Sequence, residues 1–405
     1  MKCYACKKDG LKLFLSLGHQ PPSDAFLKPE DMNKPEETYP LDCYFCPSCT
    51  LIQLGYAVDP EILFREYVYN TGSNNALRVN FHELVEKILK KYQPQKGALA
   101  VDVGSNDGTL LENYIPHGLN ILGIDPSSAT SIAIEKGIPT LVEFFNKEVA
   151  EKAVTRYGKA QIITATNVFA HVVEIDSFMD GVVSLLADDG VFITESAYVV
   201  NMVNNMSYDQ IYHEHLRYYG VKSLETLFER YSMEIIDIEE IQSHGGSIRV
   251  YAAKRGAHVK EASIAEFLTH EQEEGFWKFE KYEQFAKKIV DTKFKLLDII
   301  FELKRNGQRI IGIGAPAKGN TLLNYCKIDS DLIDYLTEKS KLKIGLFSPG
   351  MHIPVVDEEL LLKEQPEAAL ILSWNLAEEL IPKLRKLGYK GKFILPNPVP
   401  IVLEK

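Results

Sequence analysis

Four neighbouring residues, Tyr212-His213-Glu214-His215, can each donate, accept or transfer a proton. Imidazole titrates near neutral pH, so His215 is suited to act as a general base, with Tyr212 and Glu214 as supporting groups. In a helical turn Tyr212 and His215 would share a face, whereas His213 would diverge from them and act structurally. Taken singly, each side chain also has an ordinary structural role as its alternative. The run as a whole indicates acid–base catalysis.

A loop upstream of this cluster predicts a site for S-adenosylmethionine (SAM). A predicted strand at 99–103 runs into a turn with two glycines and then into a predicted helix at 109–114. Glycines allow the backbone to approach a ligand at a helix N-terminus, and Asp125, after the next strand, can accept hydrogen bonds from ribose hydroxyls. Asn167, in the segment Thr166-Asn-Val-Phe-Ala-His171, supports this interpretation, and an ordinary turn is the alternative. The expected loop residues are Gly104, Ser105, Asn106, Asp107 and Gly108.

A second Gly-rich loop, Gly312-Ile-Gly-Ala-Pro-Ala-Lys-Gly319, lies downstream of the cluster. Its glycine spacing also fits the dinucleotide fingerprint, so a nicotinamide cofactor is an alternative. Pro316 and Lys318 are unusual in that turn, however, and Lys318 at a helix start suits the negative charge of a phosphate. We therefore expect diphosphate binding by Lys318 and Asn320, with a plain structural turn as a third possibility.

Five of the six cysteines lie in the first fifty residues. Two C-x2-C pairs can present four thiolates to Zn²⁺ in a small module, and four thiolates close the coordination shell, which indicates a structural site. The predicted ligands are Cys3, Cys6, Cys46 and Cys49. Cys43 could replace either downstream ligand, and free buried thiols are the alternative to a metal site.

Length and composition limit the possible functions. A chain of 405 residues exceeds the usual size of one core, so two or three domains are expected. No apolar run approaches the ~20 residues that span a bilayer, and the start does not resemble a signal peptide, so we expect a cytoplasmic protein without a membrane partner. A net charge of −11 argues against nucleic-acid binding. The expected protein is a monomer that acts on a small polar ligand.

The hydrophobic pattern predicts an α/β fold with three modules. A zinc-binding module is expected at 1–65, a Rossmann-like class I methyltransferase domain at 66–258, and a second Rossmann-like α/β domain, preceded by a long helical connector, at 259–405. The predicted strands of the two α/β domains are 99–103, 121–125, 161–165, 191–195, 309–312, 343–347, 369–372 and 392–395. The predicted helices are 76–92, 109–114, the connector at about 260–306, 320–326 and 376–387.

Together these segments resemble one family over essentially the whole chain: the sugar C-methyltransferases that act at carbon 3 of TDP-4-keto-deoxysugars. Three segments are specific to that family: Asp209-Gln-Ile-Tyr-His-Glu-His215, His244-Gly-Gly-Ser-Ile-Arg-Val-Tyr251 and Gly314-Ala-Pro-Ala-Lys-Gly-Asn-Thr-Leu-Leu-Asn-Tyr325. The resemblance implies a SAM-dependent enzyme with a structural zinc ion and a TDP-linked nucleotide-sugar substrate.

The resemblance also implies roles for individual residues. Tyr212, Glu214 and His215 match catalytic residues, His171 matches a further active-site histidine, and Tyr69 matches a tyrosine that contacts the substrate. Deprotonation at carbon 3 by His215 would give an enolate, to which Tyr212 and His171 donate, and these roles can be exchanged. Further candidates for the sugar cleft are His244, Ser247, Arg249 and His352, with a surface position as the alternative for Arg249.

Three other functions remain possible from the sequence. One is an NAD-dependent nucleotide-sugar oxidoreductase, and another is a different SAM-dependent reaction on a related keto sugar. The third is a zinc-knuckle RNA methyltransferase, which the acidic composition disfavours.

Overall fold

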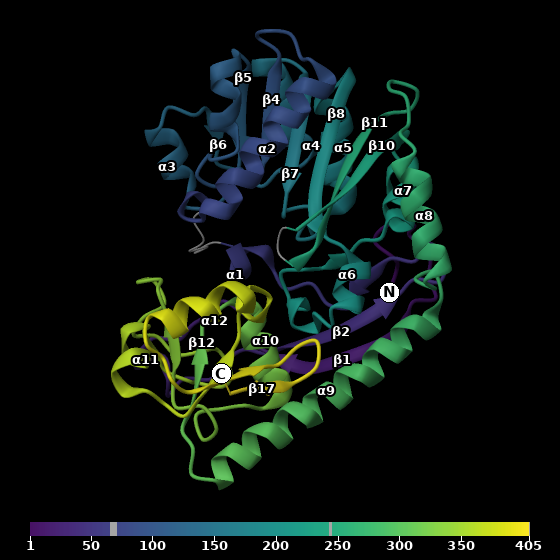
Figure 1. The fold of residues 1–405 in the computed structure, drawn as a ribbon. Coiled ribbons are helices and arrows are strands. Elements are labelled where there is room, and N and C mark those ends of the chain that lie inside the picture. Colours follow the sequence, from purple (N-terminus) through teal and green to yellow (C-terminus); the bar gives the residue numbers. More distant parts are fainter. Residues whose placement is uncertain (65–70, 243–244, 405) are drawn as a thin grey trace.

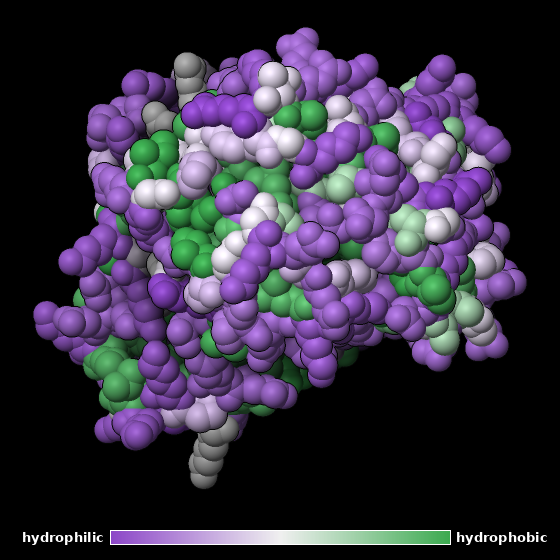
Figure 2. Space-filling model, turned by 90° about the horizontal axis from the view of Figure 1, so that it is seen from above, coloured by the Kyte–Doolittle hydropathy of each residue, from purple (hydrophilic) through white to green (hydrophobic). Residues whose placement is uncertain are grey.

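Three β-sheets organise the chain, and the computed structural model describes residues 1–64, 71–242 and 245–404. The central sheet lies at the top of Figure 1, the zinc-module strands β1 and β2 lie below it, and the C-terminal domain occupies the lower left. The predicted α/β fold class is confirmed. Seen from above, the surface is mostly hydrophilic, with apolar areas set between the polar side chains (Figure 2).

The first sheet is antiparallel and has the strand order β1-β2-β3-β9. Its strands are β1 (Lys12–Gln20), β2 (Tyr39–Phe45), β3 (Ile52–Leu54) and β9 (Arg217–Tyr218). β9 comes from the methyltransferase part of the chain and begins two residues after His215. The segment Tyr212–His215 is therefore attached at its C-terminal end to the sheet of the zinc module.

The central sheet has the order β10-β11-β8-β7-β4-β5-β6, in which β11 is antiparallel to both of its neighbours. Its strands are β4 (Leu99–Val103), β5 (Asn120–Ile124), β6 (Thr140–Leu141), β7 (Ala160–Thr166), β8 (Leu186–Ala197), β10 (Met233–Ile241) and β11 (Ser247–Lys254). Every residue of β4, and every residue of β7 except Gln161, is buried, so both faces of these strands are covered. The carboxyl ends of β4, β5 and β7 consequently meet at one edge, where ligands bind in such sheets.

The elements around the central sheet are mainly short helices. The α-helices are α1 (Pro60–Phe64), α2 (Asn75–Tyr92), α3 (Thr130–Glu135), α4 (Lys147–Tyr157), α5 (Ile175–Leu185), α6 (Val199–Asn204), α7 (Val221–Glu229) and α8 (Ser263–Glu273). Single 3-10 turns are η1 (Pro29–Asp31), η2 (Thr71–Ser73) and η4 (Tyr208–Gln210), and η3 (Leu111–His117) is longer. The helix predicted at 109–114 is thus a 3-10 helix that begins two residues later.

The C-terminal sheet has the order β14-β13-β12-β15-β16-β17 and is parallel except for β17. Its strands are β12 (Ile310–Ile313), β13 (Leu336–Glu338), β14 (Val355–Asp357), β15 (Ala368–Ile371), β16 (Lys392–Leu395) and β17 (Ile401–Leu403). Its helices are α10 (Ala317–Cys326), α11 (Glu359–Glu364), the 3-10 turn η6 (Trp374–Leu376) and α12 (Ala377–Lys386). The strand predicted at 343–347 is wrong: Phe347 makes only isolated bridges to Leu27 and Pro354.

The helical connector consists of two helices, α8 and α9 (Phe279–Arg305). They separate at Gly275, whose φ of +80° is incompatible with a continuous helix. Near its start α9 places Tyr282 against Phe14 and Phe45 of the zinc module, with ring centroids 5.4 and 5.2 Å apart. Farther along, Leu296 joins the core of the C-terminal domain. α9 therefore joins the first and third modules, as Figure 1 shows.

None of the described helices is both long enough and apolar enough to cross a membrane.

Candidate active site and zinc centre

A tight turn, rather than a helix, brings Tyr212 and His215 together. The backbone N–H of His215 donates to the carbonyl of Tyr212 at 2.9 Å, and the two ring centroids lie 4.0 Å apart. The ring of His171, from the loop after β7, lies 5.0 Å from that of His215. The side chains of Tyr212, His215 and His171, which the sequence identified as proton donors or acceptors, thus form one cluster.

The tautomer of His215 follows from its hydrogen bond to Gln210. The Nδ1 atom lies 2.9 Å from the Gln210 carbonyl oxygen. Because a carbonyl can only accept, Nδ1 carries the proton, and Nε2 is the basic nitrogen of the neutral ring. The hydroxyl of Tyr218 donates to the same carbonyl at 3.3 Å, and this second bond helps to fix the position of the carbonyl. Sequence reasoning missed Gln210, because a backbone carbonyl leaves no mark on residue type.

The loop that carries His171 is held next to the Tyr212–His215 turn by a backbone contact. The N–H of Leu216 donates to the carbonyl of Ala170 at 3.0 Å, and the carbonyl of Leu216 accepts from Leu54 of β3 at 2.9 Å. The ring of Phe64, at the end of α1, stacks on His171 at 5.7 Å. Strand β3 and helix α1 therefore help to place this histidine.

The other two members of the run point elsewhere. Glu214 lies near Asp24 and Lys343. Its carboxyl is buried, and burial, together with the nearby charge of Asp24, raises its pKa to about 8, an effect that Lys343 opposes. His213 is also buried. Its Nε2 lies 3.2 Å from the carbonyl of Tyr39, and burial lowers its pKa to about 4, in line with a structural role.

The loop after β4 has the geometry of a ligand cradle. Gly104 has a φ of +75°, and a Cβ atom there would lie 2.1 Å from the side chain of Val168, so only glycine fits. The carboxylate of Asp125, at the end of β5, accepts from the N–H of Asn106 at 2.9 Å and from that of Ser127 at 2.7 Å. Among the described residues, Ser105 Oγ is buried without a hydrogen-bond partner. These features fit SAM.

Two predicted SAM residues turn their side chains toward the protein instead. Asn106 Oδ1 accepts from the N–H of Thr71 at 3.0 Å, and Asp107 Oδ2 accepts from Gly72 at 2.7 Å. These contacts hold η2 over the loop, an element that the sequence did not identify. Asn167 lies directly after β7 with a φ of +57°, and its N–H donates to the carbonyl of Glu195 at 2.8 Å.

The four cysteines of the two C-x2-C pairs converge at the N-terminus. The sulfur atoms of Cys3, Cys6, Cys46 and Cys49 all lie within 4.8 Å of one another. This donor set fits tetrahedral Zn²⁺ and leaves no position for a substrate. Cys43 is not part of the group: it is fully buried in β2, and burial raises the pKa of its thiol.

In the C-terminal domain, Lys318 lies at a contact with the methyltransferase part. Its ammonium group is 4.8 Å from the ring centroid of Trp374, and it donates to Asn375. The Trp374 indole N–H in turn donates to the buried carboxylate of Asp209 at 2.6 Å. Burial lowers the pKa of Lys318, whereas the charge of Asp209 opposes that shift. Lys318 remains a candidate for anion binding.

Other predicted substrate residues are committed to partners within the protein. Asn320 is buried and donates to the carbonyl of Ser23 at 2.7 Å, so the β1–β2 connection covers it. His352 Nε2 lies 3.0 Å from Glu36. Each side chain completes a contact between modules, and both residues stay predicted substrate ligands; Asn320 Oδ1 is buried without a partner among the described residues.

The two described candidates in the segment after His244 are both buried. The side chain of Arg249 is only 4% exposed and pairs with Glu195 at 3.0 Å and Glu239 at 3.1 Å, so the surface alternative is wrong, and its place in the sugar cleft stays a prediction. Ser247 is fully buried at the start of β11. Tyr69 and His244 lie outside the described residues.

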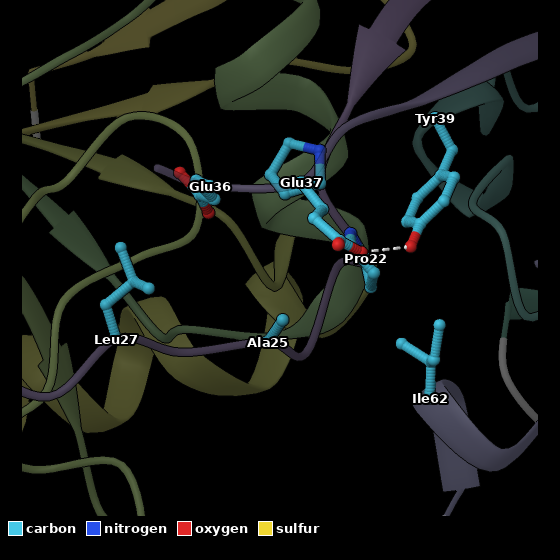
Figure 3. Close-up of a pocket in the computed structure, with 8 residues that line it drawn as sticks. Pro22, Ala25, Leu27, Glu36, Glu37, Tyr39 and Ile62 are labelled. Carbon is cyan, nitrogen blue, oxygen red and sulfur yellow. Dashed lines mark hydrogen bonds between the residues drawn. The ribbon is translucent and has the colours of Figure 1, made fainter. Parts of the chain in front are cut away.

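A separate apolar cavity of about 140 Å³ lies between the β1–β2 connection and α1 (Figure 3). Its wall includes Ile62 and two carboxylates. Glu37 accepts from the Tyr39 hydroxyl at 2.6 Å, and Glu36 accepts from the N–H of Gly350 at 2.9 Å. Two acids in an apolar wall repel phosphate, so this cavity does not suit the diphosphate of a nucleotide.

Comparison with known families gives matches along most of the chain. Residues 3–64 match a zinc binding domain, residues 74–238 a methyltransferase domain, and residues 242–398 a C-methyltransferase C-terminal domain. The cradle after β4, the cysteine group and these matches define a SAM-dependent C-methyltransferase with a zinc-binding module.

The C-methyltransferase NovU of Streptomyces niveus is 32% identical over 406 residues, which cover 100% of this chain and 97% of the relative. The chain belongs to the same C-methyltransferase family as NovU.

Two solved structures resemble part of the chain. A SAM-dependent methyltransferase from Clostridium acetobutylicum is 16% identical, covers 44% of this chain and 92% of its own, and gives a TM-score of 0.36. Magnesium protoporphyrin IX methyltransferase from Synechocystis, with bound S-adenosylhomocysteine, is 14% identical, covers 45% and 87%, and gives a TM-score of 0.35.

Proposed function

We propose that this enzyme methylates carbon 3 of a nucleotide-linked 4-keto-deoxysugar, with His215 as the general base. The observation that carries the proposal is the hydrogen bond of His215 Nδ1 to Gln210, which leaves Nε2 basic. A base matters here because a sugar carbon becomes nucleophilic only after a proton is removed. A neighbouring ketone makes that proton acidic enough for an imidazole to take.

In the proposed reaction Nε2 of His215 takes the proton from carbon 3, and the C–H electron pair forms an enolate whose charge lies on the oxygen at carbon 4. Tyr212 and His171, whose rings lie 4.0 and 5.0 Å from that of His215, are placed to donate to this oxygen. SAM supplies an electrophilic methyl group. Attack by carbon 3 forms the new C–C bond, breaks the S–C bond and leaves S-adenosylhomocysteine, and His215 then releases its proton to solvent.

The residues proposed to hold the two ligands come from different modules. The loop Gly104–Gly108 and Asp125 would hold SAM at the carboxyl edge of the central sheet. Lys318 is our candidate for the phosphates of the nucleotide sugar, because it is a cation and lies beside Asp209. Asp209 belongs to the same 3-10 turn as Gln210. A TDP-linked sugar is the first substrate to test, since it is the one that the sequence resemblance implies.

The test is incubation with SAM and TDP-, GDP- or CDP-linked 4-keto sugars in deuterated water, followed by mass spectrometry. Methylation, with deuterium exchange at carbon 3 when SAM is left out, is the expected result. The absence of both methylation and deuterium exchange with every sugar tested would refute the proposal. Reduction of added nicotinamide cofactor instead would support the oxidoreductase alternative.

Two variants test the role of the base. His215→Asn should abolish exchange and leave SAM affinity unchanged, because the residues proposed to hold SAM belong to the loop after β4 and to Asp125. His270→Asn, at an exposed position on α8, is the matched control and should exchange like the wild type. Retained exchange in His215→Asn would move the base role to Tyr212 or His171.

A further inference from the structure

Arg217 lies between the zinc module and the loop that carries His171. Its guanidinium is buried and donates through Nη1 to the carbonyl of Val172 and through Nη2 to that of Val173, the latter at 3.2 Å. These two valines directly follow His171 in the chain. The guanidinium therefore holds the backbone on the C-terminal side of this histidine.

The same guanidinium also packs on the first zinc knuckle. Its central carbon lies 4.3 Å from the ring centroid of Tyr4, a residue between Cys3 and Cys6. The N–H of Tyr4 donates to Gln53 Oε1 at 2.9 Å, and the backbone of Gln53 is paired with Arg217 across β3 and β9. The position of Tyr4 is thus fixed by the knuckle on one side and by the sheet on the other.

The charge of Arg217 makes this arrangement unusual. In the part of the chain that the structure describes, the partners of Arg217 are two carbonyls, the Tyr219 side chain and an aromatic ring, and no carboxylate pairs with it. Burying this cation is costly, and the planar fork of arginine can bond two carbonyls while it stacks on a ring. An aliphatic residue would serve a purely packing role at lower cost.

We infer that Tyr4 and Arg217 are positioning residues that couple the zinc knuckle to the place of His171 beside His215. Zinc binding then determines the geometry of the histidine pair as well as the fold of the N-terminal module. The inference rests on the proposed function, since it concerns the same histidines. It differs from that proposal in that the position of an imidazole can be measured without any substrate.

The experiment compares Tyr4→Leu and Arg217→Lys with Tyr4→Phe in the full chain loaded with zinc and SAM. Tyr4→Phe keeps the ring and is the matched control. The readouts are zinc content, SAM affinity, kcat, and the imidazole NMR signals of His171 and His215 over a pH titration, assigned with His171→Asn and His215→Asn. One zinc ion per chain should remain in all three variants.

Tyr4→Leu and Arg217→Lys should shift the His171 titration and lower kcat by about ten- to a hundredfold, because a misplaced donor loses that much. SAM affinity should stay within about twofold, which separates a positioning effect from general loss of structure. Tyr4→Phe should match the wild type in every readout.

Unchanged imidazole signals in zinc-loaded Tyr4→Leu would overturn the inference. Loss of zinc in Tyr4→Leu would also overturn it, since Tyr4 would then build the knuckle rather than transmit its position. If Arg217→Lys does not fold, Tyr4→Leu decides alone. Failure of the wild type to methylate any 4-keto sugar would refute the proposed function, whereas the imidazole signals would still decide this inference.

Discussion

The hydrogen bond between Trp374 and Asp209 gives a prediction that tests how the C-terminal domain supports catalysis. Asp209 is fully buried, and its Oδ2 accepts from the Trp374 indole at 2.6 Å. The turn that contains Asp209 ends at Gln210, whose carbonyl holds Nδ1 of His215. Trp374→Phe removes the donor but keeps an aromatic ring under Lys318. Its effect should therefore report on the hydrogen bond alone.

The free energy lost in Trp374→Phe follows from the charge of the hydrogen-bond acceptor, Asp209. A hydrogen bond to a charged group contributes about 1.5–3 kcal/mol, so a loss of about 2 kcal/mol should raise local opening of the segment 208–215 roughly thirtyfold. Hydrogen exchange followed by mass spectrometry measures this opening directly. We expect kcat to fall with it while SAM affinity stays unchanged, because Trp374 contacts the turn and not the SAM loop.

The pH dependence has a defined sign. Burial raises the pKa of Asp209, and the Trp374 N–H opposes that shift by favouring the charged form. A raised carboxyl pKa means that the native state prefers the proton, so its contribution to stability is lost as pH rises through the folded-state pKa. Removing the donor raises the pKa further. The difference between Trp374→Phe and the wild type should therefore grow as pH rises.

Trp277→Phe is the control, because this second tryptophan also donates to a buried acid, Glu271, at 3.3 Å. Glu271 keeps three other donors, from Val221, Lys222 and Tyr198, so the loss should be small and remote from the active site. The proposed support of His215 by the C-terminal domain would be refuted if Trp374→Phe showed the hydrogen-exchange rates of the wild type in the segment 208–215 and the kcat of the wild type.

Three further changes test other parts of the structure. Cys46→Ser should release zinc, measured by metal analysis, and should speed hydrogen exchange in β1–β3; retained zinc would exclude a four-thiolate site. Gly104→Ala should weaken SAM binding in calorimetry by about tenfold or more, because φ is +75° and its Cβ would meet Val168; wild-type affinity would show that the loop can shift. As pH rises from about 5 to about 8, Glu214→Gln should lose less thermal stability than the wild type, because the raised pKa of about 8 keeps Glu214 protonated in the native state while the unfolded chain ionises; parallel losses would contradict the burial of that charge.

The sequence predicted those parts of the fold that depend on local pattern. The strands at 99–103 and 392–395 agree with β4 and β16 at both ends, because a short apolar run bounded by glycine or charge has few other solutions. The strand at 343–347 was wrong for a related reason: alternating apolar residues there serve turn packing and isolated bridges rather than a ladder. Local pattern could not distinguish these two uses.

Site residues were harder to predict when their partners are distant in sequence. Asn320 contacts Ser23, and His352 contacts Glu36, across contacts between modules that no spacing rule reveals. Both are predicted substrate ligands because polar residues after a Gly-rich turn or in a loop usually face solvent, and that pattern did not reveal these contacts. The Tyr212–His215 pair was easier, since a tight turn and a helical turn both bring residues i and i+3 together.

The position of His215 explains why three modules occur in one chain. Its Nδ1 is held by Gln210, and the turn that contains Gln210 is bonded to Trp374 of the C-terminal domain. The strand that follows His215 belongs to the sheet of the zinc module. The histidine beside it, His171, comes from the loop after β7 of the central sheet. Each module therefore fixes one side of the cluster of Tyr212, His215 and His171, and a displacement of any one module would separate His215 from its neighbours.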